Sequence, residues 1–204
     1  PIGKLALYTG CAGVPPEYTL PIVLDTGTNN ESYLNDPLYP GLKHKRVTGK
    51  EYDDFIEAFV LAINEVFPKV CIQWEDFKGV DAIRILNTFR DKVCTYNDDI
   101  QGTAAIATAG FISISRLMGK PFTAQKFLFL GAGAAAFGIA DLLVQKFMKD
   151  GLTREEALEH IWMFDVNGLL VQSRTDLADY QKQFAHQGVF TNDFAEAVLQ
   201  VKPT

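Results

Sequence analysis

Hydrophobic positions follow two patterns along this chain. Short apolar runs bounded by turn-forming residues predict buried strands, and they cover 20–25, 70–74, 93–96, 126–130 and 161–165. Longer segments with apolar residues three or four positions apart predict helices, and they cover 51–67, 80–90, 100–118, 134–149 and 193–201. A further short helix is expected after Thr153, which forms a capping-box pattern with Glu156. This alternation predicts an α/β fold with parallel sheets flanked by helices.

Acidic residues follow two of the predicted strands. Glu75 and Asp76 come after 70–74, while Asp98 and Asp99 come after 93–96. Strands joined by one crossover helix usually lie near each other, so these carboxylates could converge at one sheet edge. Such hard oxygen ligands would select Mg²⁺ or Mn²⁺. The spacing alone fits a solvated acidic rim equally well.

A glycine-rich turn follows the run 126–130. Its sequence resembles the dinucleotide fingerprint and leads directly into a helix; it consists of Gly131, Ala132, Gly133, Ala134, Ala135 and Ala136. Gly131 would allow the tight turn, Gly133 the approach of a pyrophosphate, and Ala136 close helix packing. Asp165 ends the next strand, where it could accept hydrogen bonds from a ribose. A turn without a ligand and an acid that only caps a turn are the simpler alternatives.

Composition narrows the class of protein. The 204 residues carry a net charge of -6 and no block of Lys and Arg, which argues against a nucleic-acid partner. No apolar run approaches the length of a membrane span. The three cysteines are expected to be reduced core thiols, which points to a reducing compartment, the cytoplasm by default.

The sequence predicts two partial domains. The seam is placed near Asn97, which gives segments 1–97 and 98–204, the second of Rossmann type. The chain begins without Met and ends after a predicted helix that lacks a following strand. We therefore expect further sequence on both sides, and self-association through an unfinished sheet edge.

Taken together, these segments resemble the malic enzymes over essentially the whole chain. The motifs occur in the family's order, as GKLALYT at 3–9, LDTGTNN at 24–30, NDPLY at 35–39, QWEDF at 73–77, NDDIQGT at 97–103 and FLGAG at 129–133. The resemblance implies a metal- and substrate-binding domain followed by a truncated Rossmann-type NAD-binding domain. It also implies oxidative decarboxylation of L-malate to pyruvate and CO₂, with reduction of NAD(P)⁺ and a divalent metal.

The resemblance assigns roles to individual residues. Glu75, Asp76 and Asp99 correspond to the ligands of Mg²⁺ or Mn²⁺. Lys4 corresponds to the general base and Asp98 to a neighbouring catalytic carboxylate. From the residues alone, Lys4 would be read as a solvated surface lysine. The family also implies a homo-oligomer, dimer or tetramer, in the cytoplasm or alternatively the mitochondrial matrix.

The cofactor is expected to be NAD, with NADP less favoured. NADP-preferring malic enzymes carry a lysine for the 2′-phosphate in the segment 179–186, and counting back from Phe184 places the neutral Gln181 there. Asp165 would also repel a phosphate. A shift of one residue in this count would place Lys182 there instead.

Two departures and two alternatives accompany this interpretation. Ala134 replaces an acidic residue often found in the family's turn, and Gly79 stands where many members carry asparagine. The family's proton-donating tyrosine, malate-binding arginine and substrate-binding asparagines lie outside 1–204, so negligible turnover of malate is expected from this segment alone. The alternatives are another NAD-dependent dehydrogenase, which would need no metal, and a non-catalytic dinucleotide-binding module.

Overall fold

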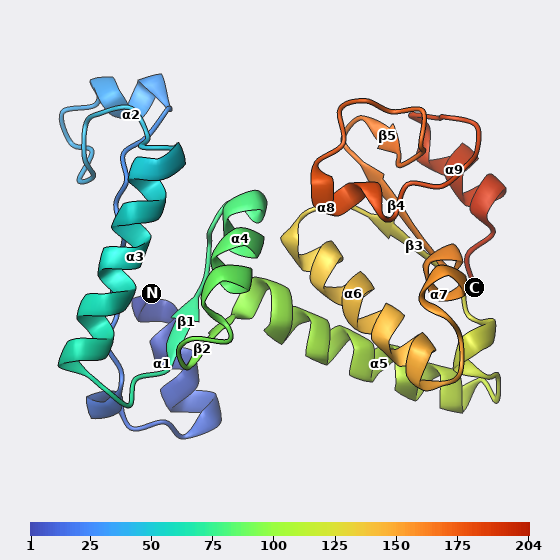
Figure 1. Cartoon of the computed structure of the whole chain (residues 1–204), viewed down its shortest axis with the longest axis horizontal. Helices are drawn as coiled ribbons and strands as arrows, with labels where there is room; N and C mark the ends of the chain where they lie inside the picture. The colour runs from blue at the N-terminus through green and yellow to red at the C-terminus, as the bar shows by residue number, and fades with distance from the viewer. The chain divides into compact units, whose positions relative to one another are not determined.

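The computed structural model describes all 204 residues and divides into two compact units, Pro1–Pro68 and Lys69–Thr204. Each unit is described by itself, and Figure 1 labels the elements. The predicted seam at Asn97 lies inside the second unit and stays a prediction. None of the helices is long and apolar enough to span a membrane.

The first unit is helical. Its elements are α1 (Ile2–Ala12), the 3₁₀ turn η1 (Pro16–Tyr18), α2 (Glu31–Asn35) and α3 (Gly49–Val66). The helix predicted over 51–67 is confirmed as α3, but its buried face is formed by Tyr52, Ile56 and Val60. Phe55, three residues after Tyr52, is exposed.

The strand predicted over 20–25 is wrong. This segment is irregular, and Leu20 and Val23 are largely exposed. A strand needs a neighbour to satisfy its backbone N–H and C=O groups, and no strand pairs with this segment. Asp25 instead holds a turn by accepting hydrogen bonds from the backbone N–H groups of Gly27 at 2.9 Å and Leu42 at 2.7 Å.

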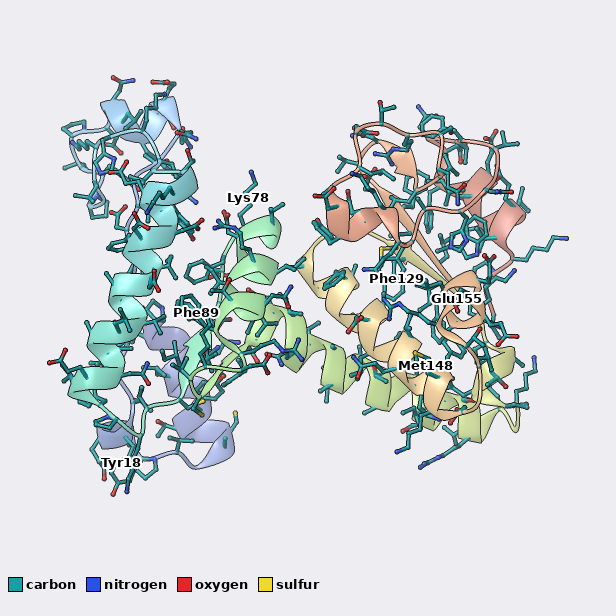
Figure 2. All side chains as sticks on the ribbon, in the orientation of Figure 1. Tyr18, Lys78, Phe89, Phe129, Met148 and Glu155 are labelled. Atoms are coloured by element: carbon teal, nitrogen blue, oxygen red, sulfur yellow. The ribbon has the colours of Figure 1, made fainter.

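The second unit begins with a small parallel sheet. Strands β1 (Ile72–Trp74) and β2 (Thr95–Asn97) pair in register, with Trp74 opposite Asn97. Helix α4 (Gly79–Phe89) forms the crossover between them and buries Phe89, labelled in Figure 2. The segment predicted as one helix over 100–118 is a π-helical turn, η2 (Asp98–Gly102), followed by α5 (Thr103–Leu117).

A three-stranded sheet forms the rest of the second unit. Strands β3 (Phe127–Leu130) and β4 (Ile161–Asp165) are parallel, and β5 (Gly168–Leu169) runs antiparallel to β4. The connecting elements are η3 (Phe122–Ala124), α6 (Ala134–Lys149), α7 (Arg154–Glu159), α8 (Asp179–Lys182) and α9 (Phe194–Val201). The predicted strands and helices of this segment are confirmed, and the Thr153–Glu156 capping box is formed.

The residues of β4 alternate between two cores, as the period of a strand requires. Ile161 and Met163 are completely or almost completely buried in the core that also contains α6. Trp162 and Phe164 pack on the opposite side, in the core of α9. Helices therefore cover both faces of the sheet, and this arrangement positions the glycine-rich turn at its edge (Figure 1).

The expectation of buried cysteines is wrong. Cys11, Cys71 and Cys94 are all exposed free thiols. The neighbour of Cys71, Ile72, begins β1 and takes the buried position instead.

Candidate functional site

The ends of β1 and β2 bring acidic residues to one edge of the small sheet. The backbone N–H of Asp76 donates a hydrogen bond to Asp99 Oδ2 at 2.8 Å, which joins the residues that follow the two strands. Asp76 adopts a left-handed backbone conformation, with φ of 61°. The two strand ends therefore meet at this pair, while the convergence of all four carboxylates stays a prediction.

Glu75 lies beside the pair in sequence, but its side chain has another partner. Gln73 Nε2 donates a hydrogen bond to Glu75 Oε2 at 2.7 Å. No three Asp, Glu, His or Cys side chains in residues 1–204 are placed to hold one metal ion. The carboxylates of Glu75, Asp76 and Asp99 are hard oxygen donors at one sheet edge, which suits a hard cation. To bind one ion together, Asp99 and Glu75 would have to give up their present hydrogen-bond partners.

Asn97 fixes the geometry of this edge. The side chain is fully buried, and its Oδ1 accepts a hydrogen bond from the N–H of Ile100 at 2.9 Å. The N–H of Asn97 donates to Gln101 Oε1 at 3.0 Å. Together these bonds hold the junction of β2 and η2 that carries Asp98 and Asp99. From the sequence, Asn97 was used only to mark the predicted domain boundary. Its position between a predicted strand and two acidic residues could have indicated this structural role.

Asp98 is held against the end of the same turn. The Asp98 carboxylate lies beside Gly102, where an added Cβ would force it to move. Asp98 therefore lies along η2, whereas the Asp99 carboxylate contacts the N–H of Asp76. The two adjacent acids thus occupy different surroundings.

The glycine-rich turn has the geometry expected for a phosphate site. Gly131 has φ of 125°, which is accessible to glycine but strained for other residues, and its N–H donates to Phe164 O at 2.7 Å. Gly133 is exposed, a Cβ added to it would have no atom within 4 Å, and it begins α6 without a side-chain cap. The first N–H groups of α6 are therefore available to an anion.

Helix α6 packs closely at Gly138, and the expected packing of Ala136 stays a prediction. A Cβ on Gly138 would lie only 2.2 Å from the carbonyl oxygen of Ile100. Gly138 therefore lets α6 contact η2, the turn that carries the acids. A second close approach joins the two regions, since a Cβ on Gly79 would lie 3.4 Å from the N atom of Ala134. The acidic edge and the glycine-rich turn are thus neighbours within one unit.

Asp165 ends β4 as predicted, but its carboxylate is engaged by Arg174. Arg174 Nη1 donates to Asp165 Oδ1 at 2.8 Å, and Nη2 donates to Oδ2 at 3.0 Å. The side chains of Arg174 and Asp165 are only 7% and 15% exposed. The backbone N–H groups of Asn167 and Gly168 also donate to Asp165 Oδ1. Asp165 is therefore a paired acid that organises its own loop.

Arg174 also binds Asp176 through two hydrogen bonds, of 2.9 and 2.6 Å. This guanidinium holds the pKa of Asp176 well below its usual range. The same contacts, first with Asp176 and then with Asp165, raise the pKa of Arg174. Arg174 was not identified from the sequence. Its position nine residues after Asp165, the acidic residue that ends β4, could have indicated this pairing.

Gln181 contacts the glycine-rich turn directly. Its Nε2 donates to Ala132 O at 3.0 Å, and its Oε1 accepts from the N–H of Ala178 at 2.9 Å. Tyr180 Oη donates to the same Ala132 oxygen at 3.2 Å, and burial, followed by the charge of Asp165, raises its pKa. Lys182 is exposed and pairs with Asp179 at 2.6 Å. The amide nitrogen of Gln181 thus holds α8 against the turn, while its amide oxygen caps the start of α8.

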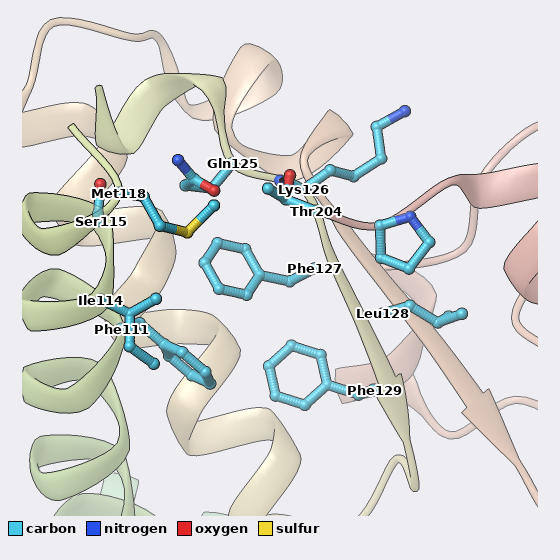
Figure 3. Close-up of a pocket in the computed structure, with 11 residues that line it drawn as sticks. Phe111, Ile114, Ser115, Met118, Gln125, Lys126, Phe127, Leu128, Phe129 and Thr204 are labelled. Atoms are coloured by element: carbon cyan, nitrogen blue, oxygen red, sulfur yellow. Dashed lines mark hydrogen bonds between the residues drawn. The ribbon is translucent and has the colours of Figure 1, made fainter. Parts of the chain in front are cut away.

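The second unit contains two cavities. One, of about 410 Å³, lies between α5 and β3 and is lined mainly by apolar side chains, among them Phe111, Phe127 and Phe129 (Figure 3). The other, also about 410 Å³, lies between α4, η2 and α6. Neither is lined by the candidate carboxylates or by residues 131–136. Lys4, the remaining predicted site residue, is partly buried on α1 of the first unit.

Comparison with protein-family models identifies the family of this chain. The family model of the malic enzyme N-terminal domain matches residues 1–90, and that of the malic enzyme NAD binding domain matches residues 100–204. The chain belongs to the malic enzyme family. The resemblance drawn from the sequence motifs is thereby confirmed, as is the mixed α/β fold with a dinucleotide-binding domain.

Several malic enzymes are similar to the whole chain. It is 49% identical over 205 aligned positions to the mitochondrial NADP-dependent malic enzyme of Mus musculus and 46% identical to the NADP-dependent malic enzyme of Homo sapiens. The chain spans 34% and 36% of the length of these proteins. Both names specify NADP, which counts against the expected preference for NAD.

Solved malic enzyme structures resemble the fold. That of Entamoeba histolytica has a TM-score of 0.52 at 26% identity, and the match covers 69% of this chain and 28% of the other. The NAD-dependent malic enzyme of Thermotoga maritima has a TM-score of 0.56 at 21% identity, covering 76% of this chain and 41% of the other. At that identity, the second match supports the fold alone.

Proposed function

We propose that the protein catalyses the oxidative decarboxylation of L-malate to pyruvate and CO₂, dependent on a divalent cation and a nicotinamide dinucleotide. The observation that carries this proposal is the packing of Gly79 against Ala134. It brings a carboxylate edge suited to a hard cation beside an uncapped glycine-rich turn suited to a pyrophosphate. A dehydrogenase without a metal would need only the turn.

Glu75, Asp76 and Asp99 would hold Mg²⁺ or Mn²⁺. When bound, such an ion lowers the pKa of a chelated hydroxyl and stabilises the charge of an enolate. The hydrogen bonds of Asn97 keep η2 in place, so Asp99 would remain at the sheet edge if its carboxylate turned from the N–H of Asp76 to hold the ion. Preorganised neighbours of this kind orient metal ligands and support their affinity.

Two further residues have proposed proton-handling roles. Lys4 would accept the proton of the malate hydroxyl as hydride leaves C2 for the dinucleotide. It enters this proposal from its motif, residues 3–9, alone. Asp98, held over Gly102, would act as the neighbouring carboxylate that sets the charge of the site. The keto acid formed then loses CO₂ and leaves pyruvate.

The dinucleotide would bind with its pyrophosphate at residues 131–136. We propose NADP as the preferred form, in place of the NAD expected from the sequence. Two arguments for NAD are weakened, because Asp165 is paired with Arg174 and the Gln181 side chain is engaged by Ala132 and Ala178. Lys182, one residue further on and exposed, is the cation suited to a 2′-phosphate.

Dinucleotide affinity tests the assignment of Lys182. Lys182→Gln should weaken NADPH binding at least tenfold, about 1.4 kcal/mol, and leave NADH binding nearly unchanged. Lys149→Gln, which removes an exposed lysine at the end of α6, serves as the matched control. Fluorescence titration of both nucleotides provides the affinities. Equal losses for NADH and NADPH would contradict a 2′-phosphate contact.

The reaction itself is tested in the protein at its natural length. L-malate should reduce NADP⁺ in the presence of Mn²⁺ and release CO₂ in equal amount, and Asp99→Asn should lower kcat/KM by at least a hundredfold. Asp91→Asn, an exposed acid of the same unit, should leave kcat/KM unchanged. Malate oxidation that needs no metal would favour a simple dehydrogenase.

The assembly and compartment follow the same proposal. We propose a homo-oligomer, dimer or tetramer, in a reducing compartment, either the cytoplasm or the mitochondrial matrix. The three free cysteines support the reducing compartment.

A further inference from the structure

Two of the exposed cysteines lie side by side at the start of the small sheet. The register of the parallel strands β1 and β2 places Ile72 opposite Thr95, and Cys71 and Cys94 come immediately before these two residues. The N–H of Ile72 donates to Cys94 O at 3.0 Å, which fixes the two backbones at this point. Thr95 Oγ1 donates to Ile72 O at 2.8 Å and holds the same register from the other strand.

The side chains of this pair contact each other. The Cys94 side chain lies close enough to act on the Cys71 thiol, whose pKa it helps to raise. Both residues are exposed to solvent, so a small oxidant can reach them. Opposed residues of neighbouring strands also have Cα separations within the range that a disulfide accepts, about 4.4–6.8 Å.

We propose that Cys71 and Cys94 form a reversible disulfide by exchange with a low-molecular-weight disulfide such as oxidised glutathione. One protein thiolate attacks the glutathione disulfide, forms a mixed disulfide and releases one glutathione thiolate. The second protein thiolate then attacks the mixed disulfide at the protein sulfur and releases the second glutathione. The protein loses two electrons and two protons, and one glutathione disulfide becomes two thiols.

The cysteine pair lies close in sequence to the candidate carboxylates. Each cysteine immediately precedes a strand that leads, four or five residues later, to Glu75 and Asp76 or to Asp98 and Asp99. Partial burial of the thiol, followed by the neighbouring Cys94 side chain, raises the pKa of Cys71. A smaller thiolate fraction slows exchange, so uncatalysed closure is expected over minutes to hours.

Cys11 provides an internal reference for the test. It is exposed on the first unit and has no neighbouring cysteine in the sequence. The folded 204-residue chain is incubated with mixtures of reduced and oxidised glutathione, alkylated, and analysed by peptide mass spectrometry. We expect Cys71 and Cys94 to join to each other while Cys11 takes up glutathione. In Cys71→Ser, Cys94 should instead carry a glutathione adduct.

A comparison with unfolded chain separates the effect of strand register from that of sequence proximity. The ratio of the Cys71–Cys94 disulfide to the mixed disulfides should fall at least tenfold when the chain is unfolded in about 8 M urea. Separate glutathione adducts on both cysteines of the folded chain would overturn the proposal. So would a fully reduced pair beside a modified Cys11, or a ratio that urea leaves unchanged.

Discussion

Gly131 and Gly133 occupy the same turn for different reasons, and substitution can separate them. Gly131→Ala places a side chain at φ of 125° and should destabilise the fold by about 1–3 kcal/mol. Gly133→Ala has open space for its Cβ, so it should leave the unfolding free energy within about 0.5 kcal/mol of the original while it weakens dinucleotide binding.

Urea unfolding and nucleotide titration of both variants measure these effects. If Gly133→Ala bound NADPH as well as the unaltered chain, the turn would not approach the pyrophosphate. If Gly131→Ala were as stable as the unaltered chain, its left-handed conformation would not be required.

Single residues show how far the sequence could be interpreted. The turn 131–136 and the pairing of Asp76 with Asp99 were predictable, because strand ends and local glycine patterns determine them. The use of Asp165 was not, because its partner Arg174 returns from a loop whose path depends on tertiary packing. The importance of Gly138 was likewise hidden, since only the approach of Ile100 makes it necessary.

At the scale of elements, Arg174 ties the end of β4 to the loop before α8. Arg174→Met keeps much of the aliphatic volume but leaves the largely buried Asp165 without its cation. Two N–H donors remain to Asp165, so we expect a loss of about 2 kcal/mol in unfolding free energy at neutral pH. Arg154→Met, which removes an exposed arginine bonded to Gln183, is the control.

The pH dependence of stability gives this prediction a sign. Arg174 depresses the pKa of Asp176 in the folded state. Its contribution is therefore present above the unfolded pKa, near 4, and is lost as the pH falls below that value. Urea unfolding from pH 7 to pH 3 should show a steeper loss for the unaltered chain than for Arg174→Met. Parallel curves would mean that this ion pair contributes nothing to folding.

The elements were predicted best where one sheet contains all the partners. Every strand and helix predicted from 126 onward is present, because β3 and β4 pair with each other and helices cover both faces. The apolar run 20–25 has the composition of a strand but no partner strand, and it remains irregular. A local run of apolar residues indicates a tendency to be buried, whereas the pairing of strands depends on the rest of the fold.

At the scale of the whole molecule, large apolar side chains remain on the surface. Ile106, Leu117 and Leu130 are 75%, 87% and 71% exposed. Exposed apolar surface favours association, so sedimentation of this chain should show a concentration-dependent increase in mass. A single monomeric species over a hundredfold range of concentration would contradict this expectation.

The proposed function depends above all on Glu75, Asp76 and Asp99 forming one metal site beside the dinucleotide turn. Titration of the 204-residue chain with Mn²⁺, followed by electron paramagnetic resonance, tests this most directly. We expect one bound ion and at least a tenfold loss of affinity in folded Asp99→Asn, with Asp91→Asn unchanged. Equal binding by all three proteins, or no binding by a chain shown to be folded, would contradict the proposal.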